Sequence, residues 1–189
     1  MKIYEKILNS VLCGQFATQY SHLNKIIDGQ YLFDCSGFVE KCLAENGFKR
    51  ALAEIRSVLK KHSYIKQNRF YCQDFYKLIV QEPRYWKFLA VNNPQLVPGD
   101  ILIVIFPNSN GHCMFIDNVL EMTKSKIALR VVDSTQFPHK NDTRCNGQTG
   151  IGAGEVLIEY DSNNQAYYNS LHPGKDKRPV KIYFVRPIK

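Results

Sequence analysis

The feature that most constrains the fold is an uninterrupted apolar run, Ile101 to Phe106, near the middle of the chain. The run has the length of a strand, is rich in β-branched residues and follows a Pro98-Gly99-Asp100 turn. A short apolar run that turn residues bound is typical of a strand buried on both faces. The sequence therefore predicts a central strand here.

Strand patterns continue to the end of the chain. Further strands are expected at 112–120, 127–134, 154–160 and 180–185. Polar turn residues separate the first two of these, which is typical of a hairpin. The second half of the chain is therefore expected to form a mostly antiparallel sheet of about five or six strands.

The first half shows helical patterns instead. Apolar residues in the first dozen positions recur at helical spacing, which predicts an amphipathic helix. A second helix is expected from Cys35, because Asp34 is a good N-cap and Gly47 a good stop. The aromatic-rich residues 51–90 are interpreted as two or three helices. Helices followed by a sheet give the fold class α+β, in one domain over residues 1–189.

The charge balance bears on the partners of the protein. Lys and Arg outnumber Asp and Glu by 25 to 17, and the net charge of +8 favours anionic partners. The densest basic stretch, 175–181, has no aromatic side chains to stack bases, so no nucleic acid is expected. No run of apolar residues is long enough to span a bilayer, so no membrane is expected. The N-terminus lacks the apolar core of a signal peptide, which predicts a cytoplasmic location or export by a dedicated secretion system. A monomer is expected.

Six cysteines are present and none form a CxxC pair, which favours a reduced compartment over a disulfide scaffold. Cys42 and Cys113 lie within apolar patterns, where a free cysteine behaves as a small buried hydrophobe. Zinc-ligand spacing is missing from the one set of residues that suggests a metal, Cys35, His112, Asp133 and His139. No metal and no cofactor are therefore expected.

Cys35 lies where a reactive cysteine is expected. It falls in the first turn of its helix, and the unsatisfied N–H groups of a helix N-terminus lower a thiol pKa. In the strand that begins at residue 112, alternation puts His112, Met114 and Ile116 on one face. If the helix covers that face, His112 faces the thiol.

A third polar group is expected beside the histidine. A hairpin centred near residues 123–125 brings Asp133 and Ser134 opposite the His112 end of the strand. A cysteine, a histidine and an acid or amide in this arrangement are what nucleophilic acyl transfer needs. The sequence therefore predicts a thiol-dependent active site.

Three blocks of sequence resemble a known family. Phe33-Asp34-Cys35-Ser36-Gly37-Phe38-Val39 resembles the FDCSGFV signature of the NlpC-type cell-wall cysteine peptidases. Pro98 to Ile101 and Gly111 to Asn118 resemble the PGD strand and the histidine strand of that family. The first block is the most specific of the three.

The resemblance implies a papain-like fold with N-terminal helices packed on the sheet. It also implies an endopeptidase or amidase that cleaves an amide bond in peptidoglycan stem peptides. Carried over by position, Cys35 is the nucleophile, His112 the general base and Asp133 the third residue. Ser134 and His139 are alternatives for the third residue.

The resemblance further implies an oxyanion hole. The backbone N–H of Cys35 contributes to it, and a tyrosine upstream of the nucleophile completes it, with Tyr20 as the candidate and Tyr31 as the reserve. Asp34 and Ser36 are expected to contact the substrate, as they do in some relatives.

The chain departs from the family pattern in ways that bear on the substrate. The glycine pair between the tyrosine and the nucleophile is missing, and residues 48–93 form a longer connection, interpreted as a helical insertion. Asp133 stands where the family more often has His, Asn or Gln. Two other functions stay open: the same chemistry on a non-cell-wall substrate, as a deamidase, acyltransferase or secreted effector, and a non-catalytic module that binds an anionic ligand.

Overall fold

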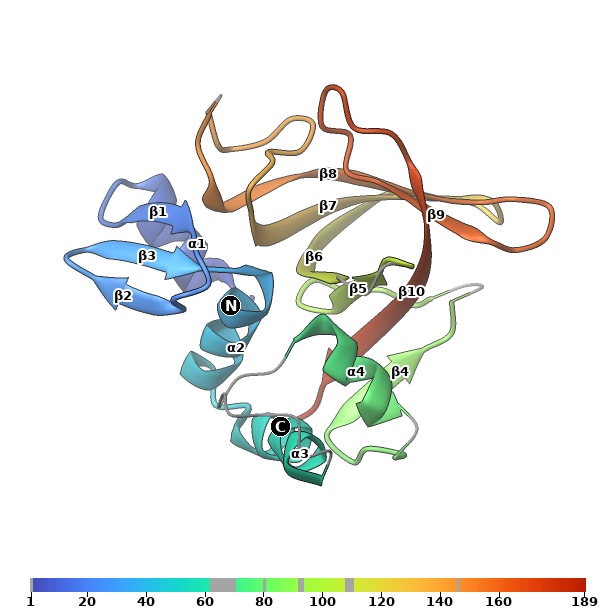
Figure 1. The fold of residues 1–189 in the computed structure, drawn as a ribbon, viewed down its shortest axis with the longest axis horizontal. Coiled ribbons are helices and arrows are strands. Elements are labelled where there is room, and N and C mark those ends of the chain that lie inside the picture. Colours follow the sequence, from blue (N-terminus) through green and yellow to red (C-terminus); the bar gives the residue numbers. More distant parts are fainter. Residues whose placement is uncertain (1, 62–70, 80, 92–93, 108–110, 146) are drawn as a thin grey trace.

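Strands dominate the computed structural model, which describes residues 2–61, 71–79, 81–91, 94–107, 111–145 and 147–189 (Figure 1). The helices in this part of the chain are α1 Glu5–Leu12, α2 Cys35–Glu45, α3 Lys49–Lys61 and α4 Cys72–Ile79. Its strands are β1 Ala17–Tyr20, β2 Lys25–Ile27, β3 Gln30–Phe33, β4 Trp86–Leu89, β5 Ile101–Ile105, β6 Gly111–Met122, β7 Lys126–Thr135, β8 Gly150–Tyr160, β9 Ala166–Asn169 and β10 Arg178–Pro187.

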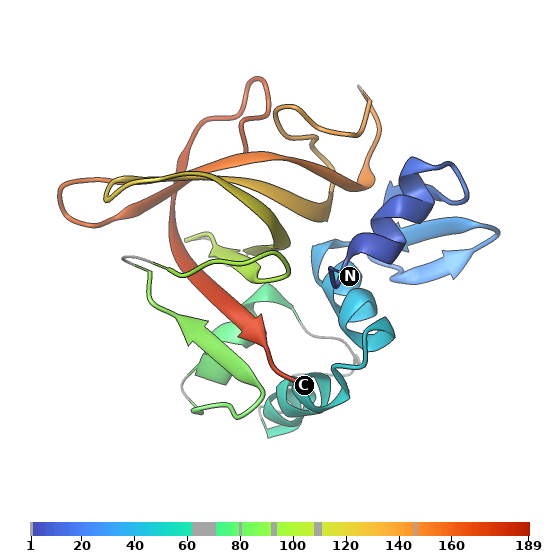
Figure 2. The ribbon, with the colours of Figure 1, turned by 180° about the vertical axis from the view of Figure 1, so that it is seen from behind.

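The larger sheet closes into an antiparallel barrel. Its strands follow one another in the order β5, β6, β7, β8, β9 and β10. Closure depends on β10, which pairs with β5 on one edge and, through Arg178 to Val180, with β9 on the other. The end of β10 pairs instead with β4, which extends the sheet beyond the barrel. Figures 1 and 2 show from opposite sides how β10 runs from the barrel toward the helices.

The expected α+β, papain-like fold is wrong. The protein is mostly β, with 21% of its residues in helices, and the sheet is closed. The strands expected from 101–106 onward are present as β5, β6, β7, β8 and β10. The closing strand, β9, has only four residues and shows no long alternation, so the sequence did not predict it. Without β9 the other strands describe an open sheet.

The helices agree better with the expectation. The helix expected near the N-terminus and the one expected from Cys35 are present as α1 and α2. The segment 48–93 contains α3 and α4, but its Trp86–Leu89 forms strand β4, so the interpretation as purely helical is wrong. A third helix expected within it would fall partly on residues 62–70, which lie outside the described residues. Among the described helices, none has the length and apolar character needed to cross a bilayer.

The two faces of β6 are the reverse of those expected. Met114 and Ile116 belong to a core cluster drawn from all six barrel strands, so they fill the barrel. Cys113 and Phe115 pack instead with the helices, and the Phe115 ring meets the Phe38 ring of α2 edge-on at 5.9 Å between centroids. Helix α2 therefore covers the outer wall of the barrel.

A small sheet guides the chain into α2. Strands β1 and β3 are parallel, and β2 lies antiparallel to β3 (Figure 1). The Thr18 hydroxyl accepts a hydrogen bond from the Ile151 N–H at 2.8 Å. Gly150 has a φ of +98°, and a Cβ at this position would lie 2.4 Å from Thr18 Oγ1, so only glycine allows this approach. The small sheet, and with it the start of α2, is thus fixed against β8.

Candidate active site

The Cys35 thiol lies at the N-terminus of α2. Asp34, the N-cap, accepts hydrogen bonds from the Gly37 N–H at 2.8 Å and from the Ser36 hydroxyl at 3.0 Å. These bonds fix the first turn, whose N–H groups and dipole favour a thiolate. Asp34 and Ser36 are buried and bond each other within this cap, and their predicted contact with the substrate stays a prediction.

Two further thiols adjoin Cys35. Cys72 Sγ lies 3.8 Å from Cys35 Sγ, and with Cys113 the three sulfurs all lie within 4.8 Å of one another. Hydrogen bonds from Cys113 and Cys72, together with the charge of His112, lower the pKa of Cys35 well below its usual value despite burial. Burial raises the pKa of Cys113. The cluster therefore carries its negative charge on Cys35.

At Cys72 the effects oppose one another. The hydrogen bond with Cys113 acts to lower its pKa, but the bond with Cys35 and burial outweigh it, and the pKa is raised well above its usual value. Cys72 consequently keeps its proton at neutral pH. A neutral thiol next to a thiolate can donate a hydrogen bond to it.

His112, the second residue of β6, links Cys35 to a carboxylate. Its Nε2 lies 2.5 Å from Asp133 Oδ2. Burial acts to lower the pKa of His112, but the Cys35 thiolate and the Asp133 carboxylate outweigh it and raise the pKa to about 10. At neutral pH the pair is therefore a thiolate and an imidazolium. With Nε2 directed at Asp133, Nδ1 is the ring nitrogen left for Cys35.

Asp133 lies fully buried in β7 and accepts from three side chains. Besides His112, these are His139 Nε2 at 2.9 Å and Arg144 Nη2 at 3.0 Å. Burial acts to raise the pKa of Asp133, but the charges of His139 and Arg144 and the bond with His112 hold it well below its usual value. The carboxylate therefore stays ionised and orients the imidazole from the rear, as a third residue does.

The two alternatives for the third residue have other partners. The Ser134 hydroxyl donates to the Phe33 carbonyl at 2.6 Å and so ties β7 to the residue before the N-cap of α2. His139 bonds Asp133 on the side away from His112, and its Nδ1 lies 3.1 Å from the Ser170 carbonyl. Both side chains thus support the site, and neither contacts His112 by a hydrogen bond within the described residues.

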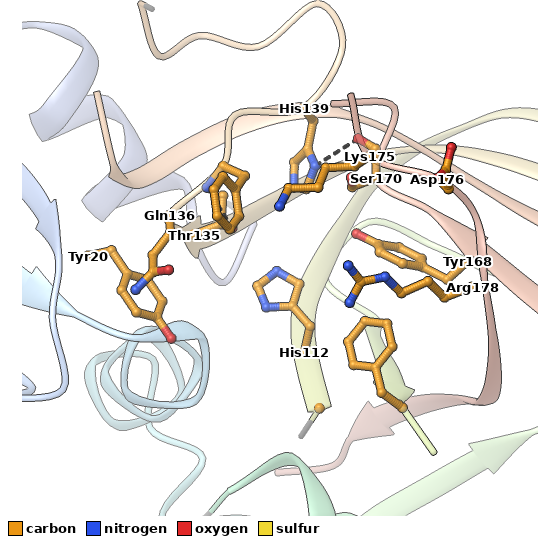
Figure 3. Close-up of a pocket in the computed structure, with 13 residues that line it drawn as sticks. Tyr20, His112, Thr135, Gln136, His139, Tyr168, Ser170, Lys175, Asp176 and Arg178 are labelled. Carbon is orange, nitrogen blue, oxygen red and sulfur yellow. Dashed lines mark hydrogen bonds between the residues drawn. The ribbon is translucent and has the colours of Figure 1, made fainter. Parts of the chain in front are cut away.

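The two tyrosines proposed for the oxyanion hole differ in position. Tyr20 ends β1 and lines the pocket together with His112 (Figure 3). Burial raises the pKa of Tyr20, and the nearby charge of Cys35 raises it further, so the phenol keeps its proton. Tyr31 is buried, with its ring 4.7 Å from that of Phe16. Tyr20 is therefore the better donor to an oxyanion.

A pocket of about 310 Å³ opens at this end of the barrel. Figure 3 shows His112 between Tyr20 on one side and Tyr168 and Arg178 on the other. Lys175 also lines the pocket, and its ammonium lies 4.2 Å from the centre of the Phe137 ring. With two cationic side chains and one acidic side chain, Asp176, beside its aromatic rings, the pocket suits a ligand with both apolar and anionic groups.

Sequence reasoning missed Arg144 and the positions of Cys72 and Cys113 in the site. Arg144 is buried, and besides Asp133 it bonds Asp142 and the Gly150 carbonyl. It falls in a loop without regular pattern, and only its burial reveals its part. Cys72 had no motif around it, and Cys113 was interpreted as a buried hydrophobe.

Comparison with known proteins adds no relative. No protein-family model, no curated protein and no solved structure matches the chain. The function must therefore be argued from the residues of the site and from the short motif around Cys35.

Proposed function

We propose that the chain is a cysteine hydrolase that cleaves an amide bond through a thioester on Cys35. The observation that carries the proposal is the continuous chain of interactions from Cys35 through His112 to Asp133. A thiolate paired with an imidazolium, itself held by a buried carboxylate, is the activated nucleophile of acyl transfer. A structural cysteine needs neither partner.

The steps follow from the charges of the site. The Cys35 thiolate attacks the amide carbon, and the C=O oxygen becomes an oxyanion that the Cys35 N–H and the Tyr20 phenol stabilise. His112 gives its proton to the leaving amine as the C–N bond breaks, which leaves a thioester. Neutral His112 then takes a proton from water, which attacks the thioester, and the acid departs while Cys35 is restored as the thiolate.

For the substrate we propose cell-wall stem peptides or their fragments. The similarity of the segment around Cys35 to the NlpC-type signature supports this class. So does the pocket, because Lys175 and Arg178 can pair with the carboxylates that such peptides carry. Cys35 is only 7% exposed, and Tyr20 and His112 line the pocket, so we expect the scissile carbonyl to reach the thiol beside these two side chains.

The test is incubation with peptidoglycan digests and free stem peptides, with mass spectrometry of the products. We expect new fragments from the natural chain and none from Cys35→Ala or His112→Ala. Cys13→Ser, a change at an exposed cysteine outside the site, is the matched control and should cleave normally. Cleavage that persists in Cys35→Ala would refute the nucleophile.

Thiol reactivity separates the enzyme from a non-catalytic binding module. Iodoacetamide near neutral pH should label Cys35 selectively, since it alone in its cluster carries a lowered pKa. If Cys35 is labelled selectively but no cell-wall peptide is cleaved, we would infer that the same chemistry serves deamidation or acyl transfer on other amides. Equal labelling of all cysteines would contradict an activated nucleophile.

A further inference from the structure

Three cysteines from separate parts of the chain direct their sulfurs at one point. Cys35 begins α2, Cys72 begins α4, and Cys113 is the third residue of β6. Their sulfurs lie within 4.8 Å of one another, with 3.8 Å between Cys35 and Cys72. All three are buried, and none is in a disulfide. Hydrolysis needs only the Cys35 thiolate, so it does not explain why the Cys72 and Cys113 thiols lie beside it.

The spacing matches that of a thiolate metal site. A tetrahedral zinc ion holds sulfur at about 2.3 Å, which places any two of its sulfurs about 3.8 Å apart. The Cys35–Cys72 distance already has this value, and the wider separations need only small side-chain adjustments. A disulfide would hold its two sulfurs about 2 Å apart, which is much closer than the 3.8 Å between Cys35 and Cys72.

His112 adjoins the cluster at Cys35 and belongs also to a second group, with Asp133 and His139. His112 interacts with Cys35 by charge and by a hydrogen bond, while its Nε2 faces Asp133 at 2.5 Å. Metal-binding histidines usually donate their second ring N–H to a carboxylate in this way. His112 can therefore present Nδ1 to an ion held by the thiols.

The backbone brings Cys72 close to β6. A Cβ at Gly111 would lie 2.5 Å from Cys72 Cβ, so glycine at this position lets α4 approach the start of the strand. The close approach sets Cys72 beside Cys113, two residues farther along β6. The packing of α4 against the barrel therefore fixes the position of Cys72 in the cluster.

We propose that Cys35, Cys72 and Cys113 bind a thiophilic d¹⁰ cation of the Zn²⁺ type, and that the His112 ring turns toward the ion to become its fourth ligand. Three thiolates and one imidazole form a common tetrahedral set for this ion. The site rests on the thiol geometry and holds whether or not the chain is a hydrolase. Its effect does rest on the proposed function: a bound ion takes the Cys35 sulfur and so blocks hydrolysis reversibly.

The binding test uses the full, reduced chain freed of metal by a chelator. We expect one equivalent of Co²⁺ to give the intense sulfur-to-cobalt absorption of a tetrahedral thiolate site, and Zn²⁺ to displace it. Cys72→Ser and Cys113→Ser should lose this absorption, whereas the exposed-site controls Cys13→Ser and Cys145→Ser should keep it. Co²⁺ that binds without thiolate absorption, or equally well in the two cluster variants, would overturn the site.

A second readout needs no variant, so a folding failure cannot obscure the result. Alkylation of the natural chain, followed by peptide mapping, should show Zn²⁺ protecting Cys35, the reactive thiol of the cluster, and leaving the exposed Cys13 and Cys145 reactive. Alkylation of Cys35 at the same rate with and without Zn²⁺ would refute the proposal. If Zn²⁺ protects Cys35 but the metal-free chain cleaves no substrate, the metal site stands and the proposed hydrolase is rejected. If the chain cleaves a substrate equally well with and without Zn²⁺, the proposal of an inhibitory metal site is rejected and the hydrolase stands.

Discussion

Asp133 Oδ2 lies 2.5 Å from His112 Nε2, and the same oxygen also accepts from His139 at 2.9 Å. Its second oxygen accepts from Arg144, so the carboxylate is enclosed by donors and fully buried. A carboxylate bound in this way cannot rotate away from His112. The orientation of the imidazole is therefore built into the barrel wall.

Replacing Asp133 by Asn should impair both stability and reactivity. The change leaves Arg144 without one of its two anionic partners, and losing one member of a buried ion pair costs about 3–5 kcal/mol. His112 also loses the charge that supports its protonated form. We expect a lower urea midpoint and slower alkylation of Cys35 at neutral pH.

Asp142→Asn is the matched control for that change. Among the described residues Asp142 bonds Arg144 and makes no hydrogen bond to His112, so the substitution should lower stability while Cys35 keeps its reactivity. If both variants slow alkylation equally, the effect of Asp133 is general destabilisation and not orientation of His112.

The ion pair predicts a distinctive pH dependence of stability. In the native state Cys35 and His112 together hold one proton, because the Cys35 pKa is lowered and the His112 pKa is raised to about 10. In the unfolded chain the pKa values are the ordinary ones, 6.5 for His112 and 9.0 for Cys35. The two side chains then hold two protons below pH 6.5, one proton between pH 6.5 and pH 9.0, and none above pH 9.0. The contribution of the pair should thus rise toward pH 6.5, stay level to pH 9.0 and fall toward about pH 10.

The measurement is urea unfolding across this range for the natural chain and for the double variant Cys35→Ala/His112→Gln. The difference in unfolding free energy isolates the pair, and each limb should slope by about 1.4 kcal/mol per pH unit for one proton. A difference curve that keeps rising between pH 6.5 and pH 9.0 would mean that His112 is neutral beside the Cys35 thiolate in the native state.

Tyr20→Phe should lower turnover and leave the fold intact. Its phenol keeps its proton because burial raises its pKa, so it can donate to an oxyanion. Loss of one such donor lowers kcat by about 100-fold to 1000-fold with little change in KM. Tyr31→Phe is the control, since the Tyr31 hydroxyl contacts Ser10 and should affect stability alone. Equal losses of kcat in both variants would exclude Tyr20 from the oxyanion hole.

The fold could be predicted from the sequence strand by strand but not as a whole. The apolar run at Ile101 and the alternation after His112 locate β5 and β6, because periodicity reports local burial. Closure is a property of distant pairing. It depends on a four-residue strand that meets β10, and the faces of β6 depend on what fills the barrel.

The site shows the same division. Cys35 and His112 were predicted because a helix start and a strand start are local signals. Asp133 followed from the register of a hairpin, which is nearly local as well. Packing brings Cys72 next to Cys35, which is 37 residues earlier in the chain, and Arg144 next to Asp133, which is 11 residues earlier. Sequence periodicity does not report such contacts.

Ser134→Ala tests whether the serine acts in catalysis or holds the site together. Its hydroxyl donates to the Phe33 carbonyl at 2.6 Å, next to the N-cap of α2, and both partners are buried. Removing the donor leaves that carbonyl unsatisfied, which costs about 1–3 kcal/mol of stability. Cys35 should then sit less firmly against His112, and kcat should fall. Because Ser134 makes no hydrogen bond to the imidazole within the described part of the chain, the pH profile of the remaining activity should keep its shape. A displaced profile would make Ser134, and not Asp133, the residue that tunes His112.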